Sequence, residues 1–170
     1  MVSKNNQMNP IQDWKNQKKD NYQTNKKFLL KLKKQKNTKK LNQLADKTHD
    51  EVFKKVDCLD CANCCTSIPP IVNKTDTNRI AKHLGMKVAD FQKEYLVQDE
   101  DGDTVMNISP CRFLEADHAC SIYEVRPKAC RAYPHTDQME FSKNINLHIQ
   151  NLNYCPAVFH IVEQLRGIPF

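Results

Sequence analysis

Long apolar runs and aromatic residues are both scarce in this sequence. No stretch approaches the roughly 18 uninterrupted apolar residues that cross a bilayer, so we expect no membrane segment. The first residues, Met1 to Pro10, are polar and contain no apolar core of a secretory signal. We therefore expect the protein in the cytoplasm. Aromatic residues make up 8% of the chain and hydrophobic residues 39%, which predicts a modest core that needs other stabilisation.

Signatures of catalysis are also missing. We recognise no catalytic triad, no phosphate-binding loop and no paired acid site, so the sequence identifies no substrate and leaves enzymatic activity open. The six histidines form no pair at ligand spacing, and we do not expect them to bind metal. They are His49, His83, His118, His135, His148 and His160.

Positive charge is concentrated at the start of the chain. Residues 1–50 contain 13 lysines and four acidic residues, a net charge of +9; because the whole chain carries +6, residues 51–170 carry −3. We interpret residues 1–40 as a basic, Lys- and Asn-rich arm, partly helical or disordered, and residues 41–170 as a separate domain. The arm lacks arginine and has no interleaved aromatic ladder, so a solvated arm is favoured over nucleic-acid binding. A protein partner is left open, and we expect a monomer.

The apolar pattern predicts a small α+β domain that is predominantly helical, with little sheet. Leu41 to Val56 follow helical intervals, with Asn37 or Thr38 as the N-cap. Further helices are predicted from a cap at Thr75 to residue 85, and over residues 89–96, 127–132 and 157–166. Residues 12–40 predict only a weak helix. Residues 98–103 predict a turn, and residues 104–108 alternate like a short strand.

Four of the eight cysteines form one short run, Cys58, Cys61, Cys64 and Cys65. A gap of two residues lets a tight turn direct two sulfurs at one centre, as in zinc knuckles and iron–sulfur loops. A reducing cytoplasm makes structural disulfides rare. The run therefore favours metal binding over an extracellular disulfide framework, the alternative that we considered.

The remaining cysteines are scattered singly at Cys111, Cys120, Cys130 and Cys155. Neighbouring side chains in extended or turn backbone point apart, so Cys64 and Cys65 are not expected to share one metal. Two sites, or one site and an unligated thiol, follow. Our preferred assignment puts Cys58, Cys61, Cys64 and Cys155 in one site and Cys65, Cys111, Cys120 and Cys130 in the other.

Iron in an iron–sulfur cluster is preferred to zinc as the cofactor. Three close cysteines with a distant fourth are typical of iron–sulfur proteins, and Cys155-Pro156 matches the Cys-Pro that ends the bacterial ferredoxin run. The same thiols can also satisfy tetrahedral zinc. Arg126 and Arg131 flank Cys130. Either they reduce the cost of thiolate charge there, or Arg126 pairs with Glu124 and Arg131 caps a short helix.

The cysteines occur in longer motifs: Cys58 to Cys65, Ser109-Pro-Cys111-Arg-Phe-Leu114, Ala119-Cys-Ser-Ile-Tyr-Glu-Val-Arg-Pro-Lys-Ala-Cys130-Arg-Ala-Tyr-Pro134, and Cys155-Pro156. Over about residues 56–156 this order closely resembles the CxxCxxCC family, also called YkgJ-like cysteine-cluster proteins. The resemblance implies a zinc- or iron-chelating domain in which all eight cysteines match family positions. Small departures are Ala62 and Asn63, where a glycine is common, and Ser109, which replaces a frequent glycine.

These observations together predict a protein that carries an iron–sulfur cluster, with a redox or maturation role. The alternatives are a zinc-stabilised binding module, whose partner contacts the arm or the last helix, and a metal storage or delivery protein. In each case the metal supplements a sparse core, so the metal-free protein is expected to be partly unfolded.

Overall fold

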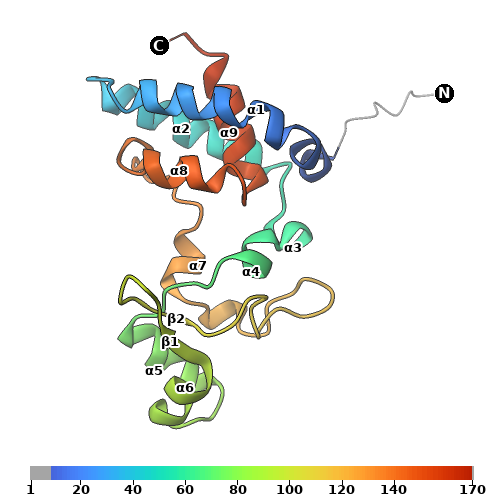
Figure 1. The fold of residues 1–170 in the computed structure, drawn as a ribbon, viewed down its shortest axis with the longest axis vertical. Coiled ribbons are helices and arrows are strands. Elements are labelled where there is room, and N and C mark those ends of the chain that lie inside the picture. The colour runs from blue at the N-terminus through green and yellow to red at the C-terminus, as the bar shows by residue number, and fades with distance from the viewer. Residues whose placement is uncertain (1–8, 170) are drawn as a thin grey trace, which may run out of the picture. The chain divides into compact units, whose positions relative to one another are not determined.

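The computed structural model describes residues 9–169, which fall into two compact units. Among these residues, unit 1 comprises 9–61 and 134–169, and unit 2 comprises Ala62–Tyr133. Helices dominate both units, and one small two-stranded sheet lies in unit 2 (Figure 1). The predicted fold class, predominantly helical α+β with little sheet, is therefore confirmed. The predicted domain boundary after residue 40 stays a prediction.

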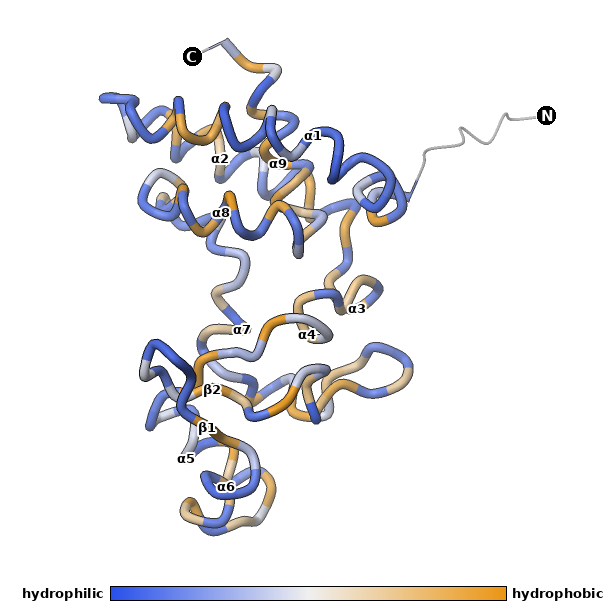
Figure 2. The backbone as a smooth tube through the Cα atoms, viewed as in Figure 1, coloured by the Kyte–Doolittle hydropathy of each residue, from blue (hydrophilic) through white to orange (hydrophobic). Residues whose placement is uncertain are grey.

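Unit 1 is built from helices alone within its described residues. They are α1 (Pro10–Leu32), α2 (Thr38–Phe53), α3 (Cys58–Cys61), the 3-10 turn η2 (Phe141–Lys143), α8 (Ile145–Asn151) and α9 (Pro156–Arg166). The C-terminal helix α9 packs against α1 and α2, and α8 packs against α1. In Figure 2, α9 carries much of the hydrophobic colour of this unit, whereas α1 is largely hydrophilic.

The basic helix α1 is a regular helix of 23 residues, where the sequence predicts only a weak one. The Asn9 side chain caps it by accepting hydrogen bonds from the backbone N–H groups of Ile11 and Gln12. One stripe of the helix is buried, including Trp14 and Leu29, and the Trp14 indole Nε1 donates to the Leu152 carbonyl at 2.9 Å. Burial of this stripe, rather than helix propensity, accounts for the order of a lysine-rich segment.

Unit 2 surrounds a small core with short elements. These are α4 (Asn63–Ser67), α5 (Lys74–His83), α6 (Val88–Tyr95), β1 (Leu96–Gln98), β2 (Thr104–Met106), the 3-10 turn η1 (Tyr123–Val125) and α7 (Lys128–Ala132). The strands are antiparallel, with Val97 opposite Val105. The buried core consists of Val72, Ile80, Ala81, Phe91, Met106, Phe113 and Ile122.

Three details differ from the sequence prediction. The cap of α5 is Asn73 and not Thr75: Asn73 and Asp76 form a reciprocal capping box, which satisfies two backbone N–H groups. Strand β1 lies where the end of a helix and a turn were predicted, because it pairs with β2. Helix α8 was not predicted. Within residues 9–169, no helix combines the length and apolar character that a bilayer crossing requires.

Candidate metal centre

The eight cysteines divide between the two units. Unit 2 contains five, namely Cys64, Cys65, Cys111, Cys120 and Cys130, and unit 1 contains Cys58, Cys61 and Cys155. Within the described residues no disulfide joins any of them. Each unit therefore brings its own group of thiols to a possible metal site.

In unit 2, backbone contacts hold the segment of Cys111 beside helix α4. The Cys111 N–H donates to the Cys65 carbonyl at 2.8 Å, and the Ser109 hydroxyl donates to the Thr66 carbonyl at 3.0 Å. The Sγ atoms of Cys64 and Cys65 lie 4.0 Å apart on α4. Cys65 and Cys111, 46 positions apart in the chain, are thus direct neighbours.

A tight hairpin connects Cys111 to Cys120. It is closed by a bridge between Leu114 and Cys120, and its tip passes through His118, which has a left-handed φ of 69°. The Ser121 N–H donates to the Phe113 carbonyl at 2.9 Å. Cys111 and Cys120 are half-buried and pack against the core of unit 2. The hydrophobic core therefore places these two ligand candidates.

The fifth cysteine of unit 2, Cys130, lies in the single-turn helix α7. Pro127 directly precedes α7, and the Arg131 N–H donates to the Pro127 carbonyl at 3.2 Å. Proline suits this place because its fixed φ is compatible with helix entry and its missing N–H would have no intrahelical acceptor. This agrees with the predicted helix over residues 127–132.

The thiols of unit 2 influence one another electrostatically. Burial, the largest cause, and the negative charges of Cys65, Cys111 and Cys120 together raise the pKa of Cys130 to about 12, against the opposing charge of Arg126. Burial also raises the pKa of Cys111 and of Cys120, and the charge of Cys65 adds to both. Hydrogen bonding from the Cys64 thiol lowers the pKa of Cys65 to about 7. Four sulfurs from three separate segments therefore share one environment.

Arg126 supplies positive charge to this environment. Its guanidinium lies 3.7 Å from the centroid of the Tyr123 ring and donates to the Tyr123 carbonyl at 2.6 Å, and its charge lowers the pKa of Cys120 and Cys130. Of the two alternatives for Arg126, the structure favours the effect on thiolates over a pair with Glu124. Arg131 lies in the last turn of α7 and is exposed.

In unit 1 the three thiols come from the two ends of α3 and the start of α9. The Asp57 carboxylate accepts from the Leu59 N–H at 2.8 Å at the start of α3. Cys155 is only 8% exposed and directly precedes Pro156 at the first turn of α9. Burial raises the pKa of Cys155 to about 12, and the charges of Cys58 and Cys61 contribute. These three cysteines thus form a second electrostatically connected group.

The family model of CxxCxxCC, described as a "putative zinc- or iron-chelating domain", matches residues 57–156. The chain belongs to the CxxCxxCC family. The matched residues include all eight cysteines. An uncharacterized protein of Methanocaldococcus jannaschii is 30% identical over 106 residues, which cover 60% of this chain and 57% of that protein. The chain therefore spans less than two thirds of the length of this relative. No solved structure matches it.

The donor set suits the metals of the CxxCxxCC family. Thiolates are soft ligands that favour zinc and iron–sulfur clusters. Within residues 9–169, no three His, Cys, Asp or Glu side chains already lie around a common point as metal ligands would. The thiols of each unit are thus near enough to interact but are not closed around one centre. How the eight cysteines are shared stays a prediction, and Cys64 lies beside Cys65 in unit 2.

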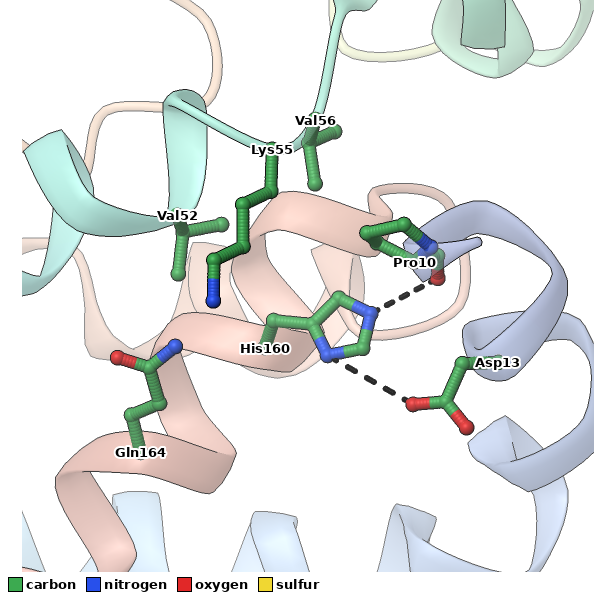
Figure 3. Close-up of a pocket in the computed structure, with 7 residues that line it drawn as sticks. All are labelled: Pro10, Asp13, Val52, Lys55, Val56, His160 and Gln164. Carbon is green, nitrogen blue, oxygen red and sulfur yellow. Dashed lines mark hydrogen bonds and ion pairs between the residues drawn. The ribbon is translucent and has the colours of Figure 1, made fainter. Parts of the chain in front are cut away.

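Sequence reasoning missed a pocket of about 530 Å³ in unit 1 (Figure 3). Its walls are Pro10, Asp13, Val52, Lys55, Val56, His160 and Gln164. The His160 imidazole contacts the Pro10 carbonyl through Nε2 at 2.8 Å, and Nδ1 lies 4.0 Å from the Asp13 carboxylate. His160 therefore links α9 to the first turn of α1. These residues come from three distant segments, so no spacing in the sequence could indicate the pocket.

Proposed function

We propose that this member of the CxxCxxCC family carries an iron–sulfur cluster, with a redox or maturation role. The cluster would be held by Cys65, Cys111, Cys120 and Cys130. When bound, such a cluster supplies one-electron chemistry, and four thiolate ligands leave no open position for a substrate.

One observation carries this proposal above all others. Cys130 lies within electrostatic reach of Cys65, Cys111 and Cys120, although these residues come from separate segments of unit 2. Ionising four neighbouring thiols costs free energy, because each thiolate raises the cost of ionising the next. A bound cation removes this cost by accepting charge from all four sulfurs.

One feature supports iron over zinc. A zinc ribbon normally supplies two separate C-x2-C pairs, whereas only one cysteine run of this chain has such gaps. In unit 2 the thiols are half-buried, so a cluster there would lie near the surface, within reach of an electron-transfer partner. Cys58, Cys61 and Cys155, all in unit 1, would contribute to a second site.

The test is anoxic purification of the full chain, followed by analysis of iron, zinc and acid-labile sulfide and by a visible spectrum. The proposal expects a brown protein that contains iron and sulfide in similar amounts and bleaches reversibly with a reductant. A colourless protein with stoichiometric zinc and no sulfide would overturn the iron–sulfur assignment.

A further inference from the structure

Asp76 and Arg79 form a largely buried ion pair on helix α5. Arg79 Nη2 lies 2.5 Å from Asp76 Oδ1, and the two side chains are 28% and 2% exposed respectively. A carboxylate is stable in such a place only when its charge and its lone pairs are satisfied. The partners of this pair therefore show what it holds in place.

The pair is bonded to the backbone of residues 125–128. Arg79 donates from Nε to the Val125 carbonyl at 3.3 Å and from Nη2 to the Arg126 carbonyl at 2.9 Å. Asp76 accepts from the Lys128 N–H at 3.1 Å through Oδ1. The intervening Pro127 is buried and has no N–H to donate. Two charged side chains of α5 thus fix three of these four residues.

The segment that they fix lies between two of the proposed ligands. Turn η1 follows Cys120, and the Tyr123 N–H donates to the Cys120 carbonyl at 3.0 Å. Helix α7 begins at Lys128, two residues before Cys130. Without the contacts of α5, this short helix would have to be ordered at the moment of metal binding, at a cost in conformational entropy.

We propose that Asp76 and Arg79 are positioning residues that fix the entry of α7 and so preorganise Cys130, together with Cys120, for metal. The inference rests on the proposed function of unit 2 as a metal centre. The two residues touch no metal ligand side chain in this role, and they act through the backbone of residues 125–128. A fixed outer support of this kind is worth about 10- to 100-fold in metal affinity at known sites.

Two variants test the proposal in the full chain. Asp76→Asn removes the charge but keeps an oxygen that can accept from Lys128. Arg79→Lys keeps the charge but cannot reach Asp76 and two carbonyl groups together, because lysine lacks the planar fork of donors. Cobalt(II) is the probe, titrated anoxically, since its visible spectrum reports thiolate ligation and tetrahedral geometry. Cys130→Ser defines the part of the spectrum that depends on unit 2.

Two further variants serve as matched controls. Glu94→Gln removes an exposed ion pair of the same unit, in which Arg112 and Glu94 lie 3.6 Å apart with side chains 46% and 51% exposed. Ile80→Val weakens packing of the same helix α5, because Ile80 is fully buried in the core of unit 2. Neither side chain is bonded to residues 125–128, so the controls separate a positioning role from loss of charge or of stability.

We expect Asp76→Asn and Arg79→Lys to weaken cobalt binding about 10- to 100-fold and to change the bands that Cys130→Ser removes, while both controls bind like the wild type. Far-UV circular dichroism verifies that each variant is folded. If Asp76→Asn loses helix, the cobalt affinity and spectrum of the milder Arg79→Lys variant decide whether the inference holds. Wild-type affinity and spectrum in folded Arg79→Lys would overturn the inference. Absence of a thiolate–cobalt band in the wild type itself would instead overturn the proposed metal centre of unit 2.

Discussion

Acidification below pH 6.5 should destabilise unit 1 through the buried histidine His148. Its side chain is fully buried, stacks on Phe141 with ring centroids 4.2 Å apart, and places Nε2 3.1 Å from the Phe141 carbonyl. Nδ1 has no hydrogen-bond partner among the described residues. A proton on Nδ1 would thus add a buried positive charge with no acceptor.

The magnitude follows from the pKa of His148. Burial lowers this pKa from 6.5 to about 4, and the nearby His135 contributes in the same direction. Between pH 6.5 and pH 4, His148 is protonated in the unfolded chain but neutral in the folded chain. Its contribution to the free energy of unfolding is therefore fully present above pH 6.5 and decreases as the pH falls towards 4. The free energy of unfolding should lose about 2 kcal/mol by pH 5 and about 3 kcal/mol by pH 4.

Denaturant unfolding at several pH values measures this loss. Trp14, the single tryptophan, is buried in unit 1 and gives a fluorescence signal for that unit. His148→Gln is the matched variant, because its amide can still donate to the Phe141 carbonyl but does not titrate. The contributions of other acid-sensitive groups to the pH dependence are the same in both proteins and cancel in the comparison. Equal pH dependence of wild type and His148→Gln would refute the reasoning.

Three further predictions concern packing, capping and metal. Trp14→Ala removes a buried ring and its hydrogen bond to Leu152, and should cost about 3–5 kcal/mol by denaturant unfolding followed by circular dichroism. Leu30→Ala, on the exposed side of the same helix, should cost less than about 0.5 kcal/mol, and equal costs would contradict the packing of α1. Asn73→Ala removes the α5 cap and should cost about 1 kcal/mol, and an unchanged free energy of unfolding would contradict the capping box. Because burial raises the pKa of Cys130 and Cys155 to about 12, these thiols are protonated at pH 7 without metal, so zinc binding should release protons and weaken as the pH falls. Calorimetry in buffers of different ionisation enthalpy counts the protons, and a count of zero would contradict thiolate ligation.

The sequence predicted correctly those helices that are marked by a capping residue or an apolar stripe of their own. Helix α2 begins at Thr38 with Asn37 as its cap, and α9 covers the apolar stripe ending at Arg166, both as predicted. Strand β1 escaped prediction because its residues become a strand only by pairing with β2. The regularity of α1 was not predicted either. Trp14 anchors this helix by a hydrogen bond to the backbone of Leu152, which lies 138 positions away in the sequence.

In the candidate site, too, local sequence features could be predicted and contacts between distant segments could not. The residue type and spacing of the cysteines predicted metal ligands, and the match to the CxxCxxCC family supports zinc or iron chelation. The contacts of Asp76 and Arg79 with residues 125–128 could not be predicted, because neither residue lies near a cysteine in the sequence. Only the fold brings them to the backbone before Cys130.

The most direct test of the account is the metal content of the anoxically purified 170-residue chain, compared with that of Cys130→Ser by elemental mass spectrometry. The account predicts bound iron or zinc in stoichiometric amount in the wild type, and loss of one metal centre in the variant. A wild type that contains no transition metal, or a variant that retains the full amount, would contradict it.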